Sequence, residues 1–190
     1  PNMIWVRRVD TGSNWKCWYN VPDLAGGGNY MVLNSNDGRA INSDEFSQGG
    51  EPNATTFGIG ANNNSNTGKY MAYCWANVPG YQMFTSYTYH GTKPFQVNLG
   101  FRPAFIILKR IGVGDNTNIN YGNWFLADTA RSPSNNVLYS EALWVHSSEV
   151  KGKRGDRSGT NAGSYLDIEI NANGFVIPTT GGGAEFNQPN

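Results

Sequence analysis

The segment GFRPAFIILKRI, residues 100–111, contains the longest unbroken run of aliphatic and Phe side chains in the chain, at residues 104–108. Pro103 stands at its start, where a strand can do without an amide donor, and Lys109 and Arg110 end it abruptly. A short run rich in Phe and Ile between Gly and Pro predicts a strand buried on both faces, and it is too short for a helix. Burial of each large side chain would stabilise the fold by about 1.5–3 kcal/mol.

The composition extends this prediction to the whole chain. Aromatic residues make up 13% of it, among many Gly and Asn, which favours an all-β fold. Apolar and aromatic runs between turn-forming residues predict strands at residues 4–9, 15–19, 29–33, 55–59, 69–77, 104–108, 123–128, 165–170 and 175–177. The short apolar pieces at residues 137–139 and 142–145 fit either a strand or a helix.

Two halves of the chain resemble each other. IWVRRV (4–9) matches IILKRI (106–111), NWKCWY (14–19) matches NWFLAD (123–128), NYMVLNS (29–35) matches NVLYSEA (136–142), and TTFGIG (55–60) matches NGFVIP (173–178). Matches that keep their order predict a duplicated β unit of roughly 100 residues. We expect two related antiparallel sandwich units of the jelly-roll or lectin-like kind, at residues 1–79 and 101–190, with a connector at residues 80–100.

The strand KYMAYCWAN, residues 69–77, has no counterpart in the second half. A sheet edge that lacks a strand is an open template for pairing with another chain. We therefore expect a homo-oligomer, for which a trimer is one option. We also expect both ends of this sequence to be cut from a longer protein.

Charge and hydropathy argue against two classes of partner. The 190 residues contain 14 cationic and 14 anionic side chains, so the formal net charge is zero. A neutral chain is not steered electrostatically to nucleic acid or to an anionic membrane. No apolar run approaches the roughly 18 residues of a membrane span. We predict neither a nucleic-acid partner nor membrane insertion.

The residues that usually carry catalysis form no motif. His90 and His146 are far apart and lack a metal-binding or nucleophile context. The carboxylates Asp128, Glu141, Asp167 and Glu169 offer no pair with the spacing that glycoside hydrolysis needs. We predict no enzyme activity, no catalytic residue, no metal and no cofactor.

The two cysteines, Cys17 and Cys74, are too few for a disulfide framework. Both lie in aromatic strand-like sequences, KCWYN and AYCWA, so we expect buried free thiols. A single bridge between two strands of the first half stays open as the alternative.

Residues 68–178 carry a resemblance to a known family. The segments GKYMAYCWANVPGYQMFTSYTYHG, FQVNLGFRPAFIILKR, NWFLADTAR and YLDIEINANGFVI are similar to a domain that recurs in tail-fibre and appendage proteins of marine phages, cyanophages especially. The resemblance implies a virion structural or receptor-binding module, made in the host cytoplasm and assembled with other tail or capsid proteins. His90 stands where the family pattern has small polar residues.

Recognition of a host-surface glycan would need an aromatic platform beside loop donors, on a rigid β scaffold. The aromatic residues in or beside such loops are Trp18, Tyr30, Tyr87, Tyr89, Tyr121 and Trp144. Asp128 and Arg131 form a D-x-x-R pattern that fits either a turn-locking ion pair or a ligand-facing carboxylate. The tryptophans within strands, which we expect in the core, are Trp5, Trp15, Trp75 and Trp124.

The resulting functional prediction is a tail fibre or tail appendage module that attaches to the host surface or to the virion. A capsid decoration protein is the alternative within this class. A surface-glycan depolymerase is the alternative from a different class.

Overall fold

A computed structural model of the chain describes residues 1–22, 26, 28–35, 37–42, 45–47, 51–60, 67–88, 94–109, 111, 124–130, 143–144 and 168–177. Its strands are β1 (Met3–Arg8), β2 (Lys16–Tyr19), β3 (Asn29–Val32), β4 (Ala40–Ile41), β5 (Tyr70–Trp75), β6 (Phe95–Asn98), β7 (Phe105–Leu108), β8 (Phe125–Asp128), β9 (Leu143–Trp144), β10 (Glu169–Asn171) and β11 (Gly174–Ile177). All their pairings are antiparallel, and the described residues contain no helix. The prediction of an all-β antiparallel fold is confirmed.

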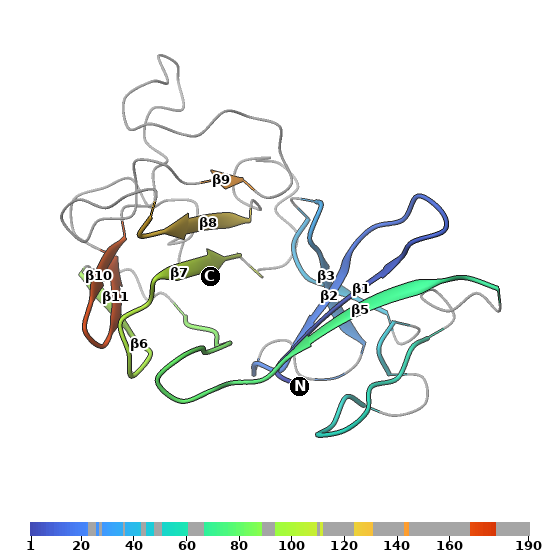
Figure 1. The fold of residues 1–190 in the computed structure, drawn as a ribbon, viewed down its shortest axis with the longest axis horizontal. Coiled ribbons are helices and arrows are strands. Elements are labelled where there is room, and N and C mark those ends of the chain that lie inside the picture. The colour runs from blue at the N-terminus through green and yellow to red at the C-terminus, as the bar shows by residue number, and fades with distance from the viewer. Residues whose placement is uncertain are drawn as a thin grey trace, which may run out of the picture. The chain divides into compact units, whose positions relative to one another are not determined.

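The chain divides into two compact units, each with its own sheets (Figure 1). Unit 1 is Pro1–Val78 with Gln82–Ser86, and unit 2 is Pro79–Tyr81 with Tyr87–Asn190. The domain boundaries expected from the sequence stay a prediction. Part of the expected connector, residues 80–100, is the strand β6 of unit 2.

Unit 1 contains one five-stranded sheet in the order β4-β3-β2-β1-β5. Side chains alternate between the two faces of a strand, so β1 sends Ile4 and Val6 to one face and Trp5 and Arg7 to the other. Ile4 and Val6 are fully buried and pack with Trp18 of β2. The core of unit 1 therefore lies on the Ile4 face of its sheet.

An irregular segment covers this core face. Phe46 is fully buried against Ile4 and Val6, and Phe57 packs at the edge of the same cluster. Next to Phe46, the carboxylate of Glu45 is buried and accepts a hydrogen bond of 2.9 Å from Lys16 Nζ. This ion pair fastens the covering segment to β2.

The predicted strand at residues 55–59 is wrong, because these residues form no strand. Asn53 Oδ1 accepts hydrogen bonds from the backbone N–H groups of Thr55 and Thr56, both at 2.9 Å. An Asn side chain that captures the following amides turns the backbone and competes with extended structure. Local polar bonding overrides the β propensity of TTFGI.

Unit 2 is a sandwich of two three-stranded sheets, β10-β11-β6 and β7-β8-β9. Both sheets contribute to one hydrophobic core, which consists of Val97, Ile106, Phe125, Ala127, Ile168, Ile170, Phe175 and Ile177. The hairpin from β10 to β11 needs a glycine, because a Cβ at Gly174 would collide with the carbonyl oxygen of Val97 on β6. Gly174 thus permits the close approach of β11 and β6.

The apolar stretch at residues 104–108 forms β7, but only one of its faces lies in the core. Ile106 is 6% exposed and belongs to the core, whereas Phe105 is 54% exposed. The expectation of burial on both faces is therefore wrong. The sandwich covers one face of this sheet, and β7 lies at its edge within the described strands.

The first two sequence matches between the halves correspond in register as well. Ile4 pairs with Trp18 in unit 1, and their counterparts Ile106 and Ala127 pair in unit 2. The third and fourth matches do not fit the strand pairing. Met31 pairs with Cys17, and the residue that pairs with the counterpart of Cys17, Leu126, is Leu143 and not residue 138. Residues 55–60 form no strand, whereas their matched segment contains β11. An internal duplication stays a prediction.

Candidate functional site

The open face of the unit 1 sheet carries a row of aromatic side chains. Trp5 lies on β1, and its cross-strand partner on β5 is Tyr73. Trp75 is two residues further along β5 and lies on the same face, as does Trp15 immediately before β2. We call Trp5, Trp15, Tyr73 and Trp75 the aromatic face.

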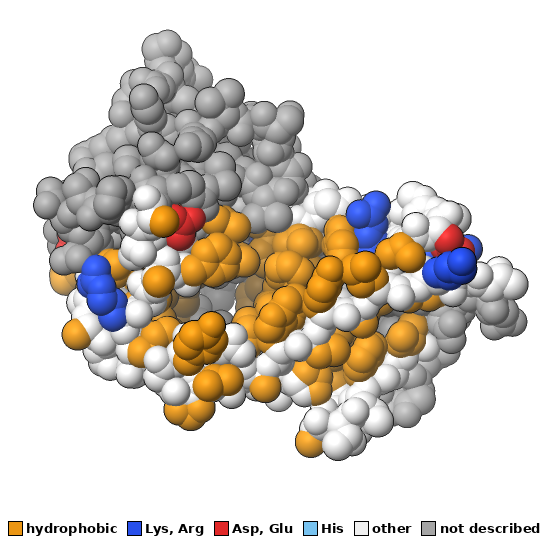
Figure 2. Space-filling model, in the orientation of Figure 1, with side chains coloured by type: hydrophobic (Ala, Val, Ile, Leu, Met, Phe, Trp, Pro, Cys, Tyr) orange, Lys and Arg blue, Asp and Glu red, His pale blue; other side chains and the backbone are white. Residues whose placement is uncertain are grey.

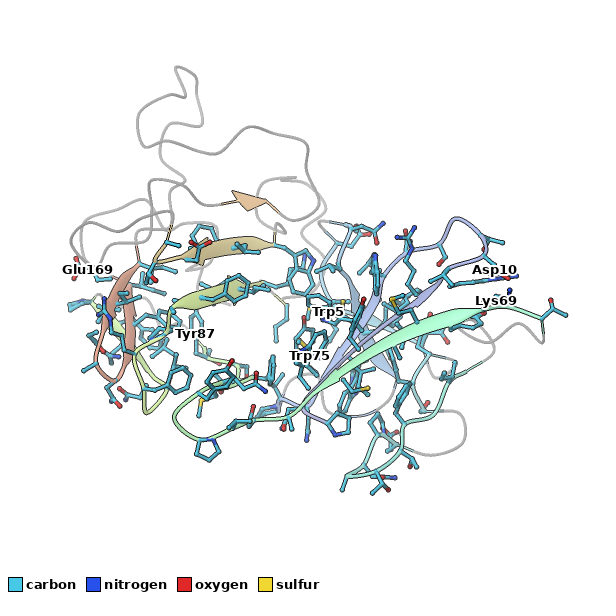
Figure 3. All side chains as sticks on the ribbon, viewed as in Figure 1. Trp5, Asp10, Lys69, Trp75, Tyr87 and Glu169 are labelled. Carbon is cyan, nitrogen blue, oxygen red and sulfur yellow. The ribbon has the colours of Figure 1, made fainter. Side chains whose placement is uncertain are left out.

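The rings of the aromatic face contact one another in sequence. Trp5 meets Trp75 edge-on with ring centroids 5.1 Å apart, Tyr73 stacks on Trp75 at 5.7 Å, and Trp15 stacks on Tyr73 at 5.9 Å. These distances are typical of favourable aromatic pairs. Trp5 and Trp75 lie beside each other at one end of β1 and β5, and Asp10 and Lys69 mark the other end of this strand pair (Figure 3). The rings of the aromatic face therefore hold one another in fixed positions.

The aromatic face is partly open to solvent. Tyr73 is 45% exposed and its neighbour Met71 is 43% exposed, while Trp5, Trp15 and Trp75 are half-buried. Figure 2 shows hydrophobic side chains gathered over the sheet of this unit. The expectation that Trp5, Trp15 and Trp75 belong to the core is wrong, because the covering segment lies on the other face.

Towards β2 the side chains on the same side of the sheet become buried. Cys17 is fully buried beside Trp5, and Trp5 Nε1 donates a hydrogen bond of 3.1 Å to the hydroxyl of Tyr19. Burial raises the pKa of Tyr19 well above its usual range, and the hydrogen bond from Trp5 lowers it only in part. Tyr19 therefore stays neutral and holds Trp5 in place.

Polar groups border the aromatic face at Trp15. The backbone N–H of Trp15 donates to Asn34 Oδ1 at 2.9 Å, and Asn34 Nδ2 donates to Asn14 Oδ1 at 2.9 Å. Both asparagines are exposed. Arg7 lies over the Trp15 ring, with its Cζ 5.6 Å from the ring centroid. The border thus combines exposed amides with a cation.

Three of the residues that the sequence suggested as ligand-facing pack in or against the cores. Trp18 is 3% exposed and donates through Nε1 to the carbonyl oxygen of Gly26 at 3.2 Å. Tyr30 packs against the unit 1 core, with Lys16 Nζ 4.2 Å from its ring centroid. Tyr87 packs against the unit 2 core, and burial raises its pKa. Burial of Trp18 corrects the expectation for that residue, while Tyr30 and Tyr87 are half-buried rings packed against the cores, and a ligand-facing role for them stays a prediction.

For the other residues that the sequence suggested as ligand-facing, the structure shows no ligand-facing side chain among the described residues. Tyr89, Tyr121 and Arg131 lie outside the described residues, as do His90, His146, Glu141 and Asp167. Trp144 lies in β9, but the position of its side chain is not among the described ones. Asp128 ends β8 opposite Phe105. The D-x-x-R alternatives therefore both stay predictions.

The two cysteines are free thiols, and the carboxylates of Asp10 and Glu45 are paired with cations. Cys17 and Cys74 are both free, so the alternative of a bridge is wrong; Cys17 is buried as expected, whereas Cys74 is exposed. The guanidinium of Arg8 lowers the pKa of Asp10 by hydrogen bonding and opposite charge. Glu45 is paired with Lys16. Nothing in these contacts activates a carboxylate for catalysis.

Within the described ranges, no group of three or more His, Cys, Asp or Glu side chains is arranged to hold a metal ion. No helix long and apolar enough to cross a membrane occurs in that part of the chain. The sequence signal for the aromatic face was the alternation Met71, Tyr73, Trp75, with its period of two.

One family model matches residues 1–188, and its description is a domain of unknown function (DUF7483). No curated protein matches the chain, and no solved structure matches it.

Proposed function

The chain belongs to the DUF7483 family, and we propose that it is a structural and host-recognition module of a virus particle, of the tail-fibre or appendage kind, whose aromatic face binds a surface glycan. The virion assignment is supported by the resemblance of residues 68–178 to tail-fibre domains of marine phages. The glycan assignment is supported by one observation, the row of contacting, partly exposed rings on a rigid sheet.

A row of rings on a sheet suits carbohydrate recognition for physical reasons. Sugar rings present a face of C–H groups that packs against an aromatic ring, while their hydroxyls need hydrogen-bond partners. Tyr73 and Trp75 offer the apolar surface, and the exposed amides of Asn14 and Asn34 lie at its border. Because the rings already contact one another, binding would cost little side-chain entropy.

The matched test replaces Tyr73 and, as a control, Tyr81. Both tyrosines are exposed, Tyr73 at 45% and Tyr81 at 76%, but only Tyr73 belongs to the aromatic face. We expect Tyr73→Ala to weaken binding to host-surface polysaccharide on a glycan array by at least about tenfold, and Tyr81→Ala to leave it unchanged. Thermal melting of both variants checks that they fold. Binding that survives Tyr73→Ala, or no binding by the native chain, would count against the proposal.

A second function, attachment to another virion protein, is favoured by the edge strand β7. Phe105 is 54% exposed there, and among the described strands β7 pairs only with β8. An exposed edge with an apolar side chain is a template for strand addition. Co-purification with tail or capsid protein that is lost in Phe105→Asp, without any glycan binding, would support attachment over recognition.

The same polysaccharide incubation tests the depolymerase alternative. Release of new reducing ends would replace the proposal of binding by one of hydrolysis.

A further inference from the structure

We propose that the aromatic face selects acidic glycans, and that Arg7 binds the anionic group of the sugar. This inference rests on the proposed glycan-binding function and adds the substrate class to it. The charge of Arg7, its contact with Trp15 and its position on β1 support it.

Arg7 is a cation on the same side of the sheet as the aromatic face. Arg7 lies on β1, with the Trp15 ring on one side and Met71 of β5, its cross-strand partner, on the other. Its Nε is buried and has no hydrogen-bond partner among the described residues, and its contact there is with the Trp15 ring. Because Nε is closed to solvent, a ligand would be bound by the terminal nitrogens of this half-buried side chain, for which the described residues show no acceptor.

The neighbouring Arg8 shows what an arginine with a structural role looks like on the same strand. Arg8 points to the opposite face and forms an ion pair with Asp10 through two hydrogen bonds. Arg7 has no such acidic partner in the described part of the chain. The two adjacent arginines are therefore satisfied in different ways, and only Arg7 retains capacity for an external anion.

The charge of the aromatic face favours an anionic ligand. The strands β1, β2, β3 and β5 contain no acidic residue. Lys69, which precedes β5 and is exposed, lies on the same face as Arg7 by strand alternation. Two described acids, Asp10 and Glu45, are paired with Arg8 and Lys16 on the other face, and Asp37 accepts a hydrogen bond from Ser35 in the turn after β3. Nothing in these strands would repel a carboxylate.

The chemistry of guanidinium identifies the ligand group. A guanidinium donates two parallel hydrogen bonds to a carboxylate or a sulfate, and the charge makes these bonds stronger than those to neutral hydroxyls. A sugar ring stacked on Trp15 or Tyr73 would place an equatorial carboxylate beside Arg7. Uronic acids and sulfated sugars have this combination of a C–H face and an anionic group.

Unit 2 contains the corresponding cation–aromatic pair, but its aromatic ring is buried. Lys109 and Trp124 are equivalent to Arg7 and Trp15 in the hairpin alignment, and Lys109 Nζ lies 5.5 Å from the Trp124 ring centroid. Trp124 is only 1% exposed, whereas Trp15 is half-buried. The pair in unit 2 is a packing element, and the pair in unit 1 is the one that a ligand can reach.

The test compares acidic and neutral forms of the same sugars. An array carries uronate-containing oligosaccharides beside their carboxyl-reduced counterparts, and calorimetric titration measures the dissociation constants of the best pair. We expect the native chain to prefer the uronate form by at least about tenfold. Arg7→Met should abolish this preference, while the matched control Arg8→Met, on the same strand but the other face, should keep it. The comparison with the native chain needs no variant, so it stays decisive whatever Arg7→Met does to folding.

The outcomes separate this inference from the proposed function. Equal binding of both forms, or a preference that survives Arg7→Met, overturns the assignment of acidic glycans and leaves glycan binding itself standing. Binding of neither form overturns both. Self-association in light scattering that disappears in Tyr73→Ala also overturns both, because a second copy of the chain would then occupy the aromatic face.

Discussion

The β1–β2 hairpin of unit 1 and the β7–β8 hairpin of unit 2 have the same register but different surroundings. In both hairpins an isoleucine faces a core, Ile4 in unit 1 and Ile106 in unit 2, and its cross-strand partner is buried with it. In unit 2 a second sheet covers this core face. In unit 1 an irregular segment with Phe46 covers it, and the sheet continues sideways into β5.

This difference shows how one hairpin pattern can support either packing or recognition. On the face away from the core, the β7–β8 hairpin has Ile107 and Leu126, while the β1–β2 hairpin has Trp5 and Cys17. Strand β5 then adds Tyr73 and Trp75 beside Trp5. The chemistry of the open face is therefore set by substitutions at positions that the core does not constrain.

The largest expected effect is the loss of either core isoleucine. Ile4→Ala and Ile106→Ala should each destabilise their unit by about 2–5 kcal/mol, because both side chains are buried and truncation leaves a cavity. Phe105→Ala is the control, since Phe105 is 54% exposed and should cost much less. Denaturant unfolding measures all three. A Phe105→Ala variant as unstable as Ile106→Ala would contradict the one-sided burial of β7.

The covering segment of unit 1 depends on the ion pair between Lys16 and Glu45, for which the described residues of unit 2 show no equivalent. Lys16→Met should destabilise the chain by about 3 kcal/mol, because it leaves the carboxylate of Glu45 buried without its cation. The control Lys69→Met removes an exposed lysine and should be nearly neutral. Equal melting temperatures of the two variants would show that this ion pair does not hold the segment.

The two cation–aromatic pairs should differ in their contribution to stability. Lys109→Met should cost about 1–2 kcal/mol, since Lys109 contacts a buried tryptophan, whereas Arg7→Met should cost about 0.5–1 kcal/mol at a half-open one. Chemical denaturation of both variants measures the difference. The reverse order would argue that Arg7 has a structural role and would weaken its assignment to ligand binding.

The smallest effect concerns the exposed pair of Arg8 and Asp10 at the end of β1. The folded state lowers the pKa of Asp10 below its ordinary value of 3.8, through the hydrogen bond and charge of Arg8. Its contribution to stability is therefore present above that value and disappears as the pH falls through the lowered pKa. The melting temperatures of the native chain and Asp10→Asn should differ slightly at neutral pH and converge in acid. A gap that widens in acid would contradict this sign.

Much of the strand framework could be predicted from the sequence. The runs around Ile4, Cys17, Met31 and Ile106 form strands where their apolar patterns place them. The register of the two hairpins was not predicted, because matches between the halves equate positions without saying which residues pair across strands. The strands β4 and β6 were missed, because β4 has only two residues and the alternation of Phe95 and Val97 in β6 was assigned to the connector.

The candidate site could not be predicted in the same way. Trp15 and Trp18 stand in one strand-like run, and the sequence does not say which face the rest of the chain covers. The structure buries Trp18 under Phe46 and leaves Trp15 half-open. The exposure of an aromatic residue depends on a covering segment that is distant in the sequence, whereas the formation of a strand depends mainly on residues close to it in the sequence.

The most direct test of the recognition account is hydroxyl-radical footprinting of the chain with and without a bound uronate oligosaccharide. Oxidation of Trp15, Tyr73 and Trp75 should decrease in the complex, because the ligand would cover the aromatic face. Oxidation of Tyr81, which is 76% exposed and lies off this face, should stay unchanged. Protection at Tyr81 with unchanged oxidation of Tyr73 and Trp75 would contradict the account.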